Sequence, residues 1–133
     1  MTRANSIGIG IIGSGFARST QIPGFRACAG ARVVAIASAR RERAEAVARE
    51  FEIPFVGGDW REVVERADVD LVSIVTPPST HLEMTLHALA HGKAVLCEKP
   101  LALNASETAE MVRAAGAAGA FALIEVVSII RWL

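Results

Sequence analysis

The chain has little of what would direct it to a membrane or to nucleic acid. Its 133 residues carry 14 lysines and arginines against 14 aspartates and glutamates, and the formal net charge is +0. A neutral chain has no bulk electrostatic attraction to nucleic acid or to an anionic membrane surface, so we expect neither as a partner. No apolar run in the sequence approaches the roughly 18 residues that a membrane-spanning helix needs.

Cysteine is also scarce. Cys28 and Cys97 fall in different predicted elements and lack the spacing of metal ligands, so we expect reduced thiols, a cytoplasmic protein and no metal site. The apolar segment Ile7–Ile12 is broken by glycines and leads into a glycine turn instead of a small-residue cleavage site. We therefore expect no signal peptide.

The chain does have a regular alternation of apolar and amphipathic segments. Hydrophobic residues make up 52% of the sequence and charged residues 21%, which is typical of a globular protein with a substantial core. Apolar segments without polar alternation indicate strands buried on both faces of a parallel sheet. The predicted strands are Ile7–Ile12, Arg32–Ser38, Ile53–Val56, Asp70–Val75, Lys93–Cys97 and Phe121–Val127.

Helical patterns separate these strands. The predicted helices are Phe16–Cys28, Arg40–Phe51, a short helix from Asp59 to Arg66, Thr80–His91, and one that begins at Asn104 or Ser106 and ends near Ala118. The repeated β-α alternation predicts the α/β class, with a doubly wound, mostly parallel sheet (a Rossmann fold) in a single domain over residues 1–127.

Several residues predict where the helices begin and end. We expect Pro23 and Gly24 to kink or end the first helix early. Asp59, with Glu62 three residues later, has the pattern of a capping box. Ser79 or Thr80 is expected to cap the helix that follows Pro78.

The first strand leads into a glycine turn, Gly13-Ser14-Gly15, followed by Phe16 and Ala17 at the expected start of a helix. A buried strand, a tight turn and a helix N-terminus form an anion site, because backbone N–H groups and the helix dipole face a pyrophosphate there. The third small position of the G-x-G-x-x-G pattern falls on Arg18, which is not small. A plain tight turn is the alternative interpretation.

The end of the second strand bears on the choice of cofactor. An NAD site usually has a carboxylate there, whereas this sequence has Ser38, Arg40 and Arg41 and no acid until Glu42. A hydroxyl and a guanidinium can bind a 2′-phosphate, so NADP is favoured over NAD. The alternative is that both arginines are solvated residues of a helix's first turn.

Three segments together resemble a known family. They are G-I-I-G-S-G-F-A, D-V-D-L-V-S-I-V-T-P-P-S-T-H and G-K-A-V-L-C-E-K-P-L-A. At this spacing they are similar to the N-terminal domain of the Gfo/Idh/MocA oxidoreductases, over Ile7 to about Glu125. The resemblance implies an NAD(P)-dependent, cytoplasmic enzyme that acts on a sugar, a polyol or a related carbonyl compound.

The resemblance also implies roles for residues. Gly13 and Gly15 would line the pyrophosphate loop, and the segment with Thr76, Pro77 and His81 would lie along the cofactor. Glu98 would face the nicotinamide ribose, and Lys99, the expected catalytic residue, would face the substrate. An ammonium there can polarise a carbonyl group.

Two further expectations concern the same region. A cis peptide bond before Pro100 is expected. His87 and His91 match nothing in the family pattern and are interpreted as surface residues of one helix.

The family pattern continues into a second α/β domain, and this chain ends at Leu133 with an apolar segment, residues 128–133. We expect that segment to be the start of a domain that is missing here. Two functions follow: the dinucleotide-binding domain of an oxidoreductase, or a catalytically incomplete dinucleotide-binding module. Exposed apolar surface would favour association, so a homo-oligomer is a further expectation.

Overall fold

A single parallel sheet organises the computed structural model, which describes residues 6–119 and 122–125. Six strands lie in the order β3-β2-β1-β4-β5-β6, and all neighbouring pairs are parallel. The strands are β1 (Ile7–Ile12), β2 (Ala31–Ala37), β3 (Phe55–Val56), β4 (Leu71–Ile74), β5 (Ala94–Glu98) and β6 (Ala122–Glu125). The strand order reverses between β1 and β4, which is the switch point where such sheets bind ligands.

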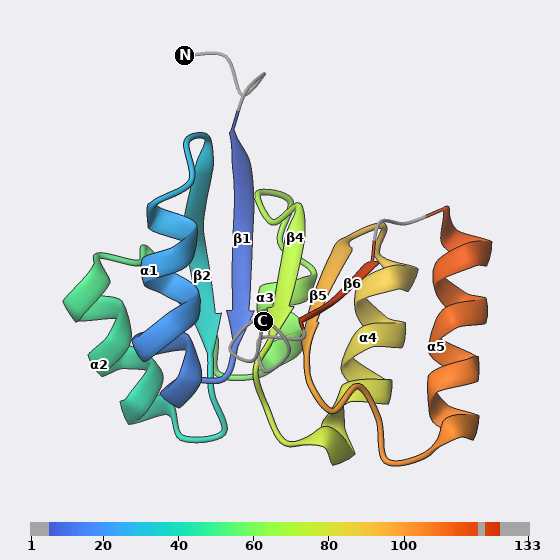
Figure 1. Cartoon of the computed structure of the whole chain (residues 1–133). Coiled ribbons are helices and arrows are strands. Elements are labelled where there is room, and N and C mark those ends of the chain that lie inside the picture. Colours follow the sequence, from blue (N-terminus) through green and yellow to red (C-terminus); the bar gives the residue numbers. More distant parts are fainter. Residues whose placement is uncertain (1–5, 120–121, 126–133) are drawn as a thin grey trace, which may run out of the picture.

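Helices cover both faces of this sheet (Figure 1). They are a π-helical turn, η2 (Ala17–Gln21), α1 (Ile22–Arg26), α2 (Arg41–Phe51), α3 (Trp60–Val64), a 3-10 turn, η3 (Pro78–Thr80), α4 (His81–Ala90) and α5 (Ala105–Ala118). The predicted fold class, a doubly wound parallel sheet, is confirmed. None of the helices in the described part of the chain is long and apolar enough to cross a membrane.

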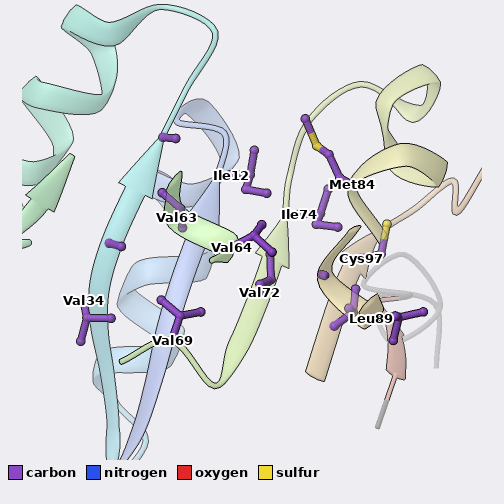
Figure 2. Packing of buried hydrophobic residues seen from close by; sticks show 14 of the residues in the cluster. Ile12, Val34, Val63, Val64, Val69, Val72, Ile74, Met84, Leu89 and Cys97 are labelled. Carbon is purple, nitrogen blue, oxygen red and sulfur yellow. The ribbon is translucent and has the colours of Figure 1, made fainter. Parts of the chain in front are cut away.

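The core has two layers, one on each face of the sheet. Ile9 and Ile11 of β1 pack with residues of η2, α1 and α2 on one face. Ile12 packs on the other face with residues of β4, α3 and α4, as Figure 2 shows. Because neighbouring residues of β1 are buried on opposite faces, the segment is apolar throughout, which explains the predicted pattern.

The first helix differs from its prediction. Pro23 and Gly24 do not end it, because Pro23 occupies the first turn of α1, where its missing N–H costs little. The irregularity lies earlier, in η2, where the N–H of Ile22 donates to the carbonyl of Ala17 five residues back. This wide turn aligns Ala17 and Ile22 on one face, and both are fully buried.

Two of the predicted helix caps are confirmed, and one is wrong. Asp59 accepts from the N–H of Arg61 and caps α3, and Asn104 accepts from the N–H of Glu107 and caps α5. Neither Ser79 nor Thr80 caps α4, since the Thr80 hydroxyl donates instead to the carbonyl of Pro77 within η3.

Other predicted boundaries shift by a few residues. The carboxylate of Glu62 accepts from the N–H of Gly58, one residue before the predicted partner Asp59. The predicted strand Phe121–Val127 is β6, and its two ends together with segment 128–133 lie outside the described residues.

Candidate functional site

The candidate site lies along the carboxyl ends of the strands. In Figure 1 the arrowheads of β1, β2 and β4 point to the same, lower edge of the sheet. The loops after these strands carry the glycine turn, Ser38 with Arg40, and Thr76-Pro77, and the loop after β5 carries Lys99-Pro100. The parallel topology therefore brings the four predicted strand-end segments to one edge.

Gly13 shapes the first loop by its backbone. Its φ is +115°, a conformation that side chains oppose, and an added Cβ would lie 2.7 Å from the carbonyl oxygen of Val75 at the end of β4. Its N–H donates to the carbonyl of Ala37 over 2.8 Å, at the end of β2. The protein itself therefore requires glycine at this position.

No steric or backbone constraint among the described residues requires glycine at position 15. Its φ is not positive, and an added Cβ would meet no protein atom within 4 Å. The first backbone bond of the following turn runs from the N–H of Arg18 to the carbonyl of Ser14 over 3.0 Å. An exposed glycine at the start of a helical turn fits a group that must approach the backbone closely, as a pyrophosphate does.

Ala17 takes the place of the third small residue of the motif, one position before Arg18. Ala17 is fully buried in the core layer of α2, so it supplies the close packing that the pattern usually assigns one residue later. Arg18 is exposed and forms an ion pair with Glu50 of α2. The departure at Arg18 therefore leaves the packing under the loop intact.

The loop after β2 touches the glycine turn. The hydroxyl oxygens of Ser14 and Ser38 lie 3.1 Å apart, as a hydrogen bond across the two strand ends. Arg40 is exposed and precedes α2, while the Nε of Arg41 donates to Glu45 over 2.9 Å. Of the two arginines, Arg41 thus has a carboxylate partner on its own helix.

His81 joins the loops after β4 and β5. Its side chain is fully buried, Nε2 lies 2.7 Å from the carbonyl of Thr76, and Nδ1 lies 3.0 Å from that of Pro100. A second carbonyl, that of Leu101, lies 3.1 Å from Nδ1. A fully buried ring with these backbone partners supports the two loops, and the expectation that the segment with Thr76, Pro77 and His81 lies along a cofactor stays a prediction.

The loop after β5 carries the predicted catalytic residue. Lys99 is exposed, Glu98 is half-buried, and the peptide bond between Lys99 and Pro100 is cis, as predicted. Cys97 is buried beneath them, and this burial raises the pKa of its thiol to about 12. Cys97 is therefore an inert core residue, as expected for a buried thiol.

Contacts run along the whole edge. Gly13 touches Val75, Ser14 touches Ser38, and His81 bridges Thr76 and Pro100. The four strand ends are thus held in one frame that offers backbone N–H groups, hydroxyls, a carboxylate and two exposed cationic side chains, Arg40 and Lys99. The sequence alone did not reveal that the frame depends on a buried histidine, although the spacing of Thr76 and His81 marked the segment.

A family model matches residues 7–125, which covers every element of this edge, and it is described as the oxidoreductase family with an NAD-binding Rossmann fold. The chain belongs to the Gfo/Idh/MocA oxidoreductase family. The resemblance of the three sequence segments is thereby confirmed.

Named relatives agree with this family. The chain is 42% identical over 90 residues to trans-1,2-dihydrobenzene-1,2-diol dehydrogenase of Mus musculus, over 68% of this chain and 27% of that protein. It is 38% identical over 116 residues to inositol 2-dehydrogenase of Gluconacetobacter diazotrophicus, over 86% of this chain and 34% of that one. The chain thus spans about a third or less of the relatives' length.

A solved structure shows the same fold. A 3-ketoreductase from Actinomadura kijaniata, in complex with NADP and TDP-benzene, superposes with a TM-score of 0.84 at 33% identity. The match covers 91% of this chain and 37% of that one. The Gfo/Idh/MocA chain described here therefore corresponds to the Rossmann part of a longer relative.

Proposed function

We propose that this chain binds NADP along the carboxyl edge of its sheet and is the dinucleotide-binding part of an oxidoreductase. Gly15 carries the proposal, because it lies at the carboxyl end of β1 where the following helical turn begins, and no described atom lies near its missing Cβ. Its backbone, with those of Ser14, Phe16 and Ala17, would hold the pyrophosphate. Thr76, Pro77 and Glu98 would line the nicotinamide side of the same edge.

The preference for NADP rests on the loop after β2. Ser38 and Arg40 lie at the position where NAD sites usually have a carboxylate, which would repel a 2′-phosphate. Arg40 is exposed. Arg41, which the sequence suggested as a second phosphate ligand, already has Glu45 as a partner. Arg40 is therefore the better candidate to contact a 2′-phosphate.

The proposed reaction is hydride transfer to or from a sugar, a polyol or a related carbonyl compound. The bound dinucleotide supplies or accepts the hydride. Lys99 would hydrogen-bond the reacting oxygen of the substrate and polarise it. This substrate class is supported by the inositol dehydrogenase and the 3-ketoreductase among the relatives.

Efficient turnover needs a substrate that is held near the cofactor and shielded from water. Lys99 is exposed in this chain. We therefore propose that this chain alone binds the dinucleotide but transfers hydride poorly, unless a further surface covers Lys99. A cytoplasmic location and a homo-oligomer remain predictions.

Fluorescence titration with NADPH and NADH tests the cofactor proposal. Arg40→Ala should weaken NADPH much more than NADH, whereas Arg32→Ala, a matched exposed arginine near the opposite end of β2, should change neither. Equal losses for the two cofactors in Arg40→Ala would refute the contact with the 2′-phosphate. Turnover of a panel of sugars and polyols by the isolated chain would refute the proposal that it is catalytically incomplete.

A further inference from the structure

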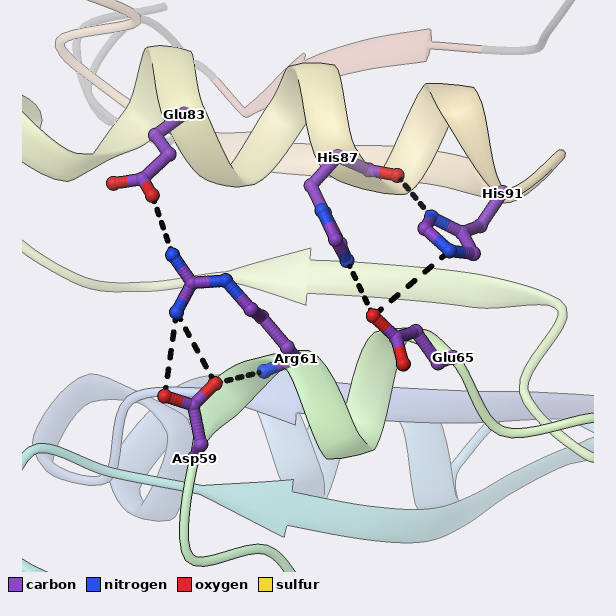
Figure 3. A network of polar contacts seen from close by, with 6 residues as sticks. All are labelled: Asp59, Arg61, Glu65, Glu83, His87 and His91. Carbon is purple, nitrogen blue, oxygen red and sulfur yellow. Dashed lines mark hydrogen bonds and ion pairs between the residues drawn. The ribbon is translucent and has the colours of Figure 1, made fainter.

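Three side chains on the surface of α3 and α4 form a cluster that the dinucleotide edge does not use. They are His87 and His91, one helical turn apart on α4, and Glu65, which follows α3. One ligand atom from each residue lies within 4.8 Å of the others. Figure 3 shows both imidazole rings pointing from α4 toward the same carboxylate.

The distances suit a small tetrahedral ion. Nε2 of His87 lies 2.9 Å from Oε1 of Glu65, and Nε2 of His91 lies 3.9 Å from the same oxygen. Ligands of a tetrahedral zinc ion at its usual bond lengths are about 3.3 Å apart. The two distances lie on either side of that value, so small side-chain rotations, with loss of the Nε2 proton that His87 donates to Glu65, would complete the geometry.

His91 is fixed in the form that a metal needs. Its Nδ1 lies 2.8 Å from the carbonyl of His87, and a carbonyl oxygen only accepts, so Nδ1 carries a proton. In the neutral ring, Nε2 then presents its lone pair toward Glu65. A lone pair facing a carboxylate is unfavourable unless a proton or a metal cation lies between them. A hydrogen bond from the other ring nitrogen to a backbone carbonyl is also what orients histidine ligands in metal sites.

Packing and exposure allow an ion to enter. The ring of His87 meets Trp60 edge-on, with centroids 5.1 Å apart, which holds the imidazole in place. The side chains of His87, His91 and Glu65 are 25%, 38% and 50% exposed. An ion would therefore have a protein side with three ligands and a solvent side that a water molecule can complete.

We propose that Glu65, His87 and His91 form a binding site for a divalent transition metal, with zinc as the expected ion. Two imidazole nitrogens and one carboxylate oxygen favour zinc, copper or nickel over magnesium or calcium, which take oxygen ligands. This departs from the sequence prediction of no metal site, although the His-x-x-x-His spacing on a helix was visible in the sequence.

The site is separate from the proposed dinucleotide edge. His91 lies ten residues beyond His81 along α4, about 15 Å at the usual helical rise. The metal proposal therefore does not rest on the proposed function, and the two can fail independently.

Zinc titration of the untagged, chelator-treated chain tests the proposal, by calorimetry and by competition with a chromophoric zinc chelator. We expect saturable binding of one ion per chain at micromolar zinc, and a visible absorption band of tetrahedral type with cobalt in its place. Loss of one ligand, in Glu65→Gln or His91→Ala, should weaken zinc by at least about tenfold.

Two control variants separate this site from other ligands. Glu83→Gln removes an exposed carboxylate of the same helix, and Cys28→Ser removes the exposed thiol, so both should bind zinc as the unaltered chain does. Circular dichroism checks that each variant folds, and either ligand variant alone decides the matter. Unchanged affinity in a folded Glu65→Gln or His91→Ala variant, or binding only at millimolar zinc, would overturn the proposal.

Discussion

The two halves of the ligand edge are held in place by different means. On the side of β1 and β2, the loop is shaped by the backbone of Gly13 and one contact between the hydroxyls of Ser14 and Ser38. On the side of β4 and β5, a buried side chain, His81, bridges two loops through their carbonyl groups. The glycine loop is therefore set by backbone geometry and short hydroxyl side chains, whereas the loops after β4 and β5 are supported by a buried ring.

The largest loss of stability is expected from substitution of Gly13, in the half formed by β1 and β2. Gly13→Ala forces a side chain into a left-handed conformation and against the carbonyl of Val75, and we expect a loss of at least about 3 kcal/mol in the free energy of unfolding. Urea denaturation measures it. Gly24→Ala is the control, since an added Cβ there meets no atom within 4 Å, and it should stabilise α1 by about 0.5–1 kcal/mol. Similar effects in the two variants would contradict the role of Gly13.

In the half formed by β4 and β5, the largest loss of stability is expected from substitution of His81. His81→Phe keeps a buried ring but removes both ring nitrogens, so a carbonyl of Thr76 or Pro100 that accepts a ring N–H loses its donor, and we expect a loss of about 1–3 kcal/mol. Thermal and urea unfolding measure it. A His81→Phe variant as stable as the unaltered chain would show that the ring fills space and does not bridge the loops.

A smaller effect is expected further along the second half, where the loop after β5 leads into α5. Asn104 caps this helix by accepting from the N–H of Glu107 over 2.9 Å. Asn104→Ala should lower the free energy of unfolding by about 1 kcal/mol. Asn104→Asp, which can accept the same bond, should retain most of the stability, and an equal loss in both variants would contradict the capping role.

The smallest expected effect concerns the reactivity of the two cysteines, Cys28 after α1 and Cys97 in β5. Cys28 is exposed, whereas burial raises the pKa of Cys97 to about 12. Because the thiolate is the reactive form and pH 8 lies well below that pKa, Cys97 should stay protonated and unreactive in the folded chain. Mass spectrometry after iodoacetamide treatment at pH 8 should find label on Cys28 alone, and rapid label on Cys97 without denaturant would show that the β5 half is looser than described.

Local pattern was enough to predict most of the fold. Apolar segments such as Ile7–Ile12 gave the strands correctly, because a residue buried on either face must be apolar whichever way it points. The glycine turn and the segments around Thr76 and Glu98 were placed on strand ends for the same reason. These features depend on neighbours in the sequence and on the parallel topology.

Features that depend on distant contacts were missed. The bridging role of His81 was not predicted, because two of its partners, the carbonyls of Pro100 and Leu101, are nearly twenty residues away and leave no local pattern. His87 and His91 do lie at the surface, as expected, but their shared contact with Glu65 left no local pattern because Glu65 follows another helix. Arg18 was taken as a defect in the glycine motif, although Ala17 and the wide turn η2 had already supplied the packing.

The central claim is that the bare loop at Gly15 receives the pyrophosphate of a dinucleotide, and NADPH binding to Gly15→Ala tests it most directly. The added methyl group meets no protein atom within 4 Å, so stability should not fall, as in the control Gly116→Ala. We expect Gly15→Ala to weaken NADPH binding by about tenfold, or 1.4 kcal/mol, at an unchanged midpoint of unfolding, while Gly116→Ala binds NADPH normally. Equal affinity in Gly15→Ala and the unaltered chain would contradict it.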